Sequence, residues 1–118
     1  MLSVKKRNGE IVDFNLGKIE AAIEQAFKSV KREYSKDMLE LLALRVCANF
    51  KDKVENEVIS VEDIQDSVEI VLIQSSFVDV AKSYILYRHN LFHLNKGKNQ
   101  KYSWEIYYHL KYQFLEWY

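Results

Sequence analysis

Residues 1–23 read MLSVKKRNGEIVDFNLGKIEAAI, which predicts a basic β-hairpin placed directly in front of a helix. Residues 3–7 and 10–14 have the composition of two short strands. Asn8-Gly9 lies between them and is the favoured two-residue loop of a type I′ turn, because both residues tolerate a positive φ. Asn15 then precedes a helix over residues 16–30 and is a good N-cap, since its side chain can accept a hydrogen bond from the first turn.

Lys18 occupies the first turn of this predicted helix, where the positive end of the helix dipole makes a cation unfavourable. The placement is reasonable if an anion binds there. Lys5, Lys6, Arg7 and Lys18, with the free amides of the helix start, can together hold a polyphosphate. The alternative is an ordinary solvated strand end, and strand alternation directs Lys6 away from Lys5 and Arg7. Gly17-Lys18 is not a P-loop, because the preceding glycine of that motif is missing.

The composition limits the classes of function. A chain of 118 residues with 48% apolar residues is long enough for one domain with a core. Its 17 basic and 17 acidic residues cancel. A neutral chain is a poor candidate for nucleic-acid binding, which usually requires a surplus of lysine and arginine.

Cys47 is the single cysteine, so neither an internal disulfide nor a zinc ribbon can form. We expect a reducing, cytoplasmic location and a thiol that serves as a small core residue rather than a nucleophile. No apolar run approaches the roughly 20 residues of a membrane span, and residues 1–23 lack the apolar core that is typical of a signal peptide. The chain is therefore expected to have no membrane partner.

Three further helices follow the hairpin and first helix. Ser35 caps the second, which is apolar around most of its circumference and is therefore expected to be central. Ser60 or its neighbour begins the third, with Glu62 and Asp63 in the first turn, and residues 77–91 form the fourth. The predicted fold class is α+β, mostly α, with a small hairpin or sheet capping a four-helix bundle.

The last quarter of the chain has a different composition. Residues 93–101 are polar, basic and glycine-containing, which predicts a linker. Residues 102–118 form an aromatic tail with Ser103 as a candidate helix cap. We expect this tail to pack on the bundle or to dock a partner, and stacking on single-stranded nucleic acid ranks last. Its aromatic residues are Tyr102, Trp104, Tyr107, Tyr108, Tyr112, Phe114, Trp117 and Tyr118.

Three segments, in this order, resemble the ATP-cone domain family: residues 4–23, 61–69 and 79–88. The resemblance covers about residues 3–92, so residues 1–92 are expected to be the nucleotide-binding domain. ATP-cones are regulatory modules at the N-terminus of ribonucleotide reductases and in a zinc-ribbon repressor of reductase genes. The repressor is excluded as the full protein here, because this chain has no cysteine cluster.

The resemblance implies a small sheet capping four helices, with ATP or dATP bound between sheet and helices, together with Mg²⁺. It implies that ATP favours an active assembly and dATP an inhibited oligomer. The expected partners are adenine nucleotides and either further copies of the chain or a reductase catalytic subunit. The third and fourth helices resemble those of anaerobic reductases more closely.

Matching positions carry the expected nucleotide contacts onto this chain. Lys18 would contact phosphate and Ile19 the base or sugar. Where the family has a hydroxyl residue and a histidine, this chain has Val61 and Gln65, and Ser60 can supply the hydroxyl. A basic residue of the fourth helix corresponds to Leu91, for which Arg88 can substitute. The full set of expected contacts is Val4, Lys6, Arg7, Asn15, Lys18, Ile19, Ser60, Gln65, Tyr87 and Arg88.

The acidic residues of the third helix have two interpretations. Glu62, Asp63, Asp66 and Glu69 can suggest a metal site, but a helix-start preference and a solvated face explain them better. Magnesium is expected to arrive with the nucleotide.

The sequence therefore predicts a non-catalytic regulatory module that controls the assembly or activity of a ribonucleotide reductase. One cysteine cannot supply the redox thiols of a reductase active site. The main alternative is a standalone nucleotide-sensing adaptor that docks a partner through its aromatic tail. A nucleotide-hydrolysing enzyme would need a general base and a metal site that no motif clearly provides.

Overall fold

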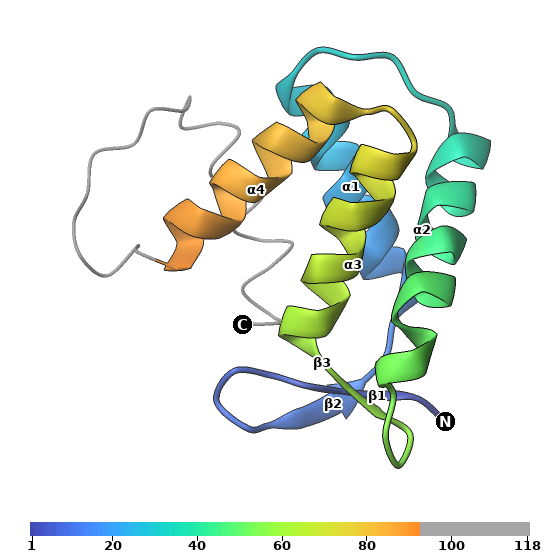
Figure 1. Ribbon diagram of the computed structural model, residues 1–118, viewed down its shortest axis with the longest axis vertical. Coiled ribbons are helices and arrows are strands. Elements are labelled where there is room, and N and C mark those ends of the chain that lie inside the picture. The colour runs from blue at the N-terminus through green and yellow to red at the C-terminus, as the bar shows by residue number, and fades with distance from the viewer. Residues whose placement is uncertain (93–118) are drawn as a thin grey trace.

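A computed structural model describes residues 1–92, which form a small sheet at one end of a four-helix bundle (Figure 1). The expected fold class, α+β and mostly α, is confirmed. The predicted linker, residues 93–101, and the aromatic tail, residues 102–118, lie outside the described residues. The elements are β1 (Ser3–Lys5), β2 (Ile11–Asp13), α1 (Leu16–Ser29), α2 (Lys36–Phe50), the 3-10 helix η1 (Lys51–Lys53), β3 (Val58–Ser60), α3 (Val61–Gln74) and α4 (Val78–Phe92).

Val4 is the centre of the sheet, whose strand order is β2-β1-β3. It pairs with Val12 of the antiparallel strand β2 and with Ile59 of the parallel strand β3. Its side chain is buried in the core. The sequence patterns did not separate β3 from the charged segment before it. The sheet therefore joins the start of the chain to the segment that leads directly into α3.

The hairpin loop differs from the predicted type I′ turn. Lys6 donates its amide to the Glu10 carbonyl (2.8 Å), which leaves a loop of three residues. The Gly9 amide donates to the Lys6 carbonyl (3.0 Å). The φ of Gly9 is +89°, whereas the φ of Asn8 is not positive. This is the pattern of a type I turn followed by a left-handed glycine. Strand β1 ends at Lys5. The alternation of side chains along a strand therefore does not determine the directions of the Lys6 and Arg7 side chains.

Three predicted helix caps are confirmed. The side chain of Asn15 accepts a hydrogen bond from the Gly17 amide (2.9 Å). Ser35 and Ser60 do the same for the third helical residue of α2 and α3, each at 3.1 Å. Each cap satisfies an amide that the helix itself leaves without an acceptor.

The helices surround a single apolar core, and each packs against two others (Figure 1). The expectation that α2 is central is wrong. One face of α2 packs against α1 and α3, but Leu41 and Leu44 on its other face are 51% and 57% exposed. Helix α2 thus has more apolar residues than fit on its buried face, and the others are exposed. No helix within residues 1–92 has the length and apolar character needed to cross a membrane.

Candidate functional site

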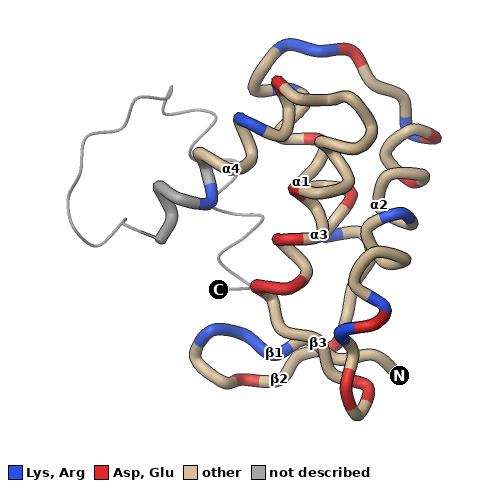
Figure 2. The backbone as a smooth tube through the Cα atoms, viewed as in Figure 1, with Lys and Arg blue, Asp and Glu red and all other residues tan. Residues whose placement is uncertain are grey.

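The predicted nucleotide contacts come from the hairpin, the start of α1, the start of α3 and the second half of α4. Figure 1 shows the hairpin loop, the first turn of α3 and the end of α4 on one side of the molecule. Figure 2 shows that basic residues of the hairpin and acidic residues at the start of α3 lie on this side. The described contacts link the hairpin loop, α3 and α4 through one ion-pair network.

Arg88 is the centre of this network. Its guanidinium contacts Glu62 at 2.8 Å, Asp66 at 2.8 Å and Glu69 at 3.1 Å. These carboxylates follow one face of α3 over two turns, so a single arginine fastens α4 along α3. Glu62 also binds Arg7 of the hairpin loop, with Oε1 2.8 Å from Nε. The network therefore connects sheet, α3 and α4.

Hydrogen bonds stabilise the charged forms of Glu62 and Arg88. Partial burial alone would raise the pKa of Glu62, but hydrogen bonds from Arg7 and Arg88 outweigh it and hold the pKa below its usual range. Burial alone would lower the pKa of Arg88, yet its hydrogen bonds to Asp66, Glu62 and Glu69 raise it instead. Each group is therefore charged across the physiological range.

The lowered pKa of Glu62 predicts a pH-dependent stability. A carboxylate with a depressed folded-state pKa stabilises the protein above its unfolded pKa, about 4.3, and loses this contribution as the pH falls through the folded value. The Glu62 side chain is 42% exposed, which limits the effect by solvent screening. We expect Glu62→Gln to lower the free energy of unfolding by at most about 1 kcal/mol at neutral pH.

The measurement is urea unfolding, followed by circular dichroism, at about pH 7 and about pH 3. The difference between the native chain and Glu62→Gln should be smaller at the lower pH, since the contribution of Glu62 is lost as the pH falls through its folded-state pKa. Glu40→Gln, at an exposed position of α2, is the matched control and should show little difference at either pH. If the stability difference for Glu62→Gln were equal at both pH values, the lowered pKa of Glu62 in the folded protein would be contradicted.

The start of α1 contains two further predicted contacts, Asn15 and Lys18. Asn15 accepts two hydrogen bonds from the first turn of α1. Its side-chain oxygen accepts one from the Gly17 amide (2.9 Å), and its backbone carbonyl accepts one from the Lys18 amide (3.1 Å). These two amides therefore already have acceptors, and the contact between amides of the helix start and a phosphate stays a prediction. The Lys18 side chain is half-buried, and the first turn of α1 has no acidic residue. Lys18 thus remains a cation at the positive end of a helix.

Val4 and Ile19 are in the core rather than at the surface. Both side chains are almost completely buried, Val4 in the middle strand and Ile19 in the first half of α1. In the described conformation they support the junction of sheet and helices but do not face solvent. Contact between either side chain and a nucleotide would require this junction to open.

The remaining predicted residues differ in accessibility. Lys6 pairs with Glu10 at 3.6 Å, and only 16% of its side chain is exposed. The Ser60 oxygen accepts the Asp63 amide, which leaves the hydroxyl proton available to donate. Gln65 is completely buried in α3. Tyr87 belongs to α4, but its side chain lies outside the described part of the chain.

Sequence reasoning missed the role of Glu62, which it treated as a helix-start acid. The available signal was the spacing of Glu62, Asp66 and Glu69, which places three carboxylates on one helix face. Within residues 1–92, no three histidine, cysteine, aspartate or glutamate side chains gather in a way that can hold a metal. These carboxylates instead converge on Arg88.

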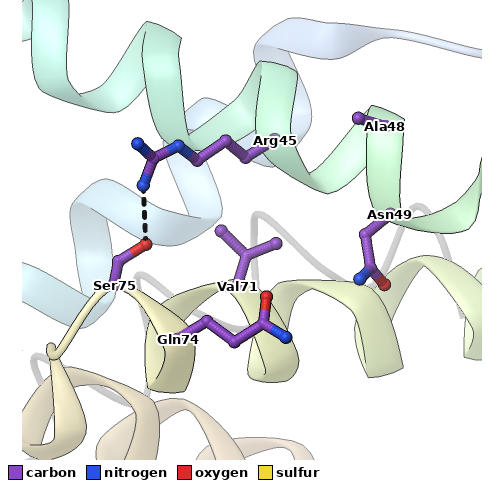
Figure 3. A pocket seen from close by; sticks show the side chains of 6 residues that line it. All are labelled: Arg45, Ala48, Asn49, Val71, Gln74 and Ser75. Atoms are coloured by element: carbon purple, nitrogen blue, oxygen red, sulfur yellow. Dashed lines mark hydrogen bonds between the residues drawn. The ribbon is translucent and has the colours of Figure 1, made fainter.

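Two cavities lie outside the set of predicted contacts. One of them reaches the start of α1, where Gly17 lines it. A groove of about 370 Å³ between α2 and α3 is shown in Figure 3, where Arg45 reaches across to Ser75 (3.1 Å) above Val71. A second cavity of about 370 Å³ lies between α1 and α2, and Tyr34 and Lys36 also line it. Neither contains a residue of the predicted contact set.

Comparisons with known proteins agree with the fold. Residues 2–91 match the family model described as the ATP cone domain. The chain is 52% identical over 90 residues to the vitamin B12-dependent ribonucleoside-diphosphate reductase of Thermoplasma acidophilum, covering 72% of this chain and 11% of that protein. It is 36% identical over 95 residues to the enzyme of the same name from Mycobacterium tuberculosis, covering 80% and 13%.

A third relative is the ribonucleoside-diphosphate reductase subunit alpha of Chlamydia pneumoniae, 32% identical over 106 residues, with 85% of this chain and 10% of that protein covered. The chain thus spans only about a tenth of the length of these relatives. Two of the three are named as vitamin B12-dependent enzymes and none as an anaerobic one. The anaerobic assignment made from the sequence finds no support in them and is not retained.

Proposed function

The chain belongs to the ATP-cone domain family, and from this membership we propose that it binds ATP or dATP and thereby regulates a ribonucleotide reductase. The regulated reductase would be one related to the vitamin B12-dependent enzymes and alpha subunits that the chain resembles. The proposed contact set is the one predicted from the sequence, with Lys6, Arg7 and Lys18 as the phosphate-binding cations.

The observation that carries this proposal is the position of Lys18. Lys18 lies in the first turn of α1, at the positive end of the helix dipole, and this turn contains no acidic residue. A cation retained at such a place stabilises the fold little, and a bound phosphate would make it favourable. Arg7 and Lys6, on the hairpin that precedes α1, would add charge from the sheet side.

Magnesium would accompany the nucleotide in this proposal. Mg²⁺ is usually held by substrate phosphates and water together with one or two carboxylates. That expectation is compatible with a described chain in which carboxylates pair with arginines rather than forming a ligand cluster.

Regulation rather than catalysis is the proposed role. The thiol of Cys47 is half-buried, and burial raises its pKa, which is the opposite of what a reactive thiolate needs. ATP and dATP would act by binding with different affinities to two assemblies, formed with further copies of the chain or with a reductase catalytic subunit. The size of that difference sets how far either nucleotide can shift the assembly.

The test is titration calorimetry of the purified chain with ATP and dATP, with GTP as control, in the presence of Mg²⁺. We expect micromolar binding of the adenine nucleotides and much weaker binding of GTP. Size-exclusion chromatography of each mixture reports the assembly, which should differ between ATP and dATP. No heat with any nucleotide would contradict the proposed binding, while equal sizes would contradict only the proposed change in assembly.

A further inference from the structure

Glu62 is held between two guanidinium groups. Its Oε1 is 2.8 Å from Arg7 Nε, and its Oε2 is 2.8 Å from Arg88 Nη2. The two arginines come from the β1–β2 loop and from α4. Arginine recognises carboxylates and phosphates through the same donor geometry. The Glu62 carboxylate therefore occupies a place where a phosphate oxygen would find complementary donors.

The two arginines are not equivalent. Arg88 has only 16% of its side chain exposed and keeps Asp66 and Glu69 as further partners. Arg7 lies in the hairpin loop, with 30% of its side chain exposed. An anion from solvent can therefore reach Arg7 with less disturbance, and Arg88 can hold Glu62 in place during the exchange.

We propose that Glu62 is a built-in anionic competitor for the nucleotide phosphate, which holds Arg7 in the nucleotide-free protein and releases it when a phosphate binds. This inference rests on the proposed function and deepens it, since it names a residue that regulates the same site. Its regulatory consequence follows from the network. Glu62 connects the hairpin loop to α4 through Arg88, so phosphate binding at Arg7 releases the hairpin loop from the α3–α4 pair.

An ordinary surface ion pair has a different signature. If the contact between Arg7 and Glu62 only stabilises the fold, removing the carboxylate lowers stability and leaves phosphate affinity unchanged or weaker. If Glu62 competes with phosphate, removing its charge removes the carboxylate that competes for the Arg7 guanidinium and also removes a like charge near the phosphates. Phosphate affinity then rises although stability falls.

The test compares Glu62→Gln with Asp63→Asn by calorimetry with ATP and with inorganic tripolyphosphate. Asp63 is the neighbouring acid in the same helical turn, and its carboxylate pairs with Lys53 at 3.8 Å. It therefore provides a matched loss of one negative charge. We expect Glu62→Gln to bind both ligands about threefold to tenfold more tightly. Asp63→Asn should change either affinity by less than about twofold.

The outcomes separate the two proposals. If the native chain binds no adenine nucleotide, the proposed function fails and this inference fails with it. If the native chain binds ATP but Glu62→Gln binds it equally or more weakly, only the competition is overturned. Equal tightening by Asp63→Asn would also overturn it, because a general charge effect would then be sufficient.

A measurement on the native chain covers the case in which Glu62→Gln fails to fold. Carbon-13 resonances of side-chain carboxylates and nitrogen-15 resonances of arginine Nε report on the two partners directly. Saturation with tripolyphosphate should shift both the Glu62 carboxylate and the Arg7 Nε, while the Arg88 Nε changes little. Unchanged Glu62 and Arg7 resonances, in a protein that binds the ligand, would overturn the inference.

Discussion

Arg88→Ala is expected to destabilise the protein by about 2 to 4 kcal/mol, the largest loss from any single charged residue of the described chain. The substitution leaves Glu62, Asp66 and Glu69 on one face of α3 without the cation that they share. Their mutual repulsion then opposes folding, and the packing of the arginine stem is also lost. Urea unfolding followed by circular dichroism measures the difference in unfolding free energy.

Two controls separate charge from shape at this position. Arg88→Lys keeps the charge but loses the planar fork, so its stability should lie between those of the native chain and Arg88→Ala. Added salt should recover part of the loss in Arg88→Ala, because it screens repulsion among exposed carboxylates. A stability of Arg88→Ala within about 0.5 kcal/mol of the native chain would show that the network is energetically unimportant.

Lys18→Ala is expected to weaken ATP binding by about tenfold to a hundredfold, which corresponds to the loss of one charge-assisted contact to phosphate. The same substitution should change the unfolding free energy by at most about 1 kcal/mol, because Lys18 is not among the residues of the apolar core. The loss of ATP affinity should therefore not be accompanied by a comparable loss of stability. Calorimetry with ATP and thermal unfolding of the free protein measure the two quantities.

Lys36→Ala is the matched control for this prediction. Lys36 is the first residue of α2, and Lys18 lies in the first turn of α1. Both substitutions therefore remove a lysine from the start of a helix. Lys36 is outside the predicted contact set, and its loss should leave ATP affinity within about twofold of the native value. Equal losses in both variants would indicate a general effect of net charge and would remove Lys18 from the site.

Local signals in the sequence predicted the local structure well. Asn15, Ser35 and Ser60 were recognised as caps because a cap depends on hydrogen bonds within a few residues. The hairpin was recognised for the same reason, but its loop was not, since Asn8-Gly9 also fits a three-residue loop with only the glycine left-handed.

Features that depend on distant contacts were not predictable in the same way. Strand β3 has only three residues, and its pairing with β1 joins segments far apart in the sequence. The network around Arg88 requires α4 to pack along α3, which no local pattern specifies. The family resemblance supplied a list of contact residues without their orientation, and Val4 and Ile19 consequently proved to be buried.

The most direct test of nucleotide binding at the junction of sheet and bundle is a nitrogen-15 chemical-shift titration of the labelled chain with ATP and Mg²⁺. The largest amide shifts are expected in the hairpin loop, in the first turn of α1 and at the start of α3. Shifts confined to the α2–α3 groove around Arg45 and Gln74, with the hairpin and Lys18 unchanged, would contradict this expectation.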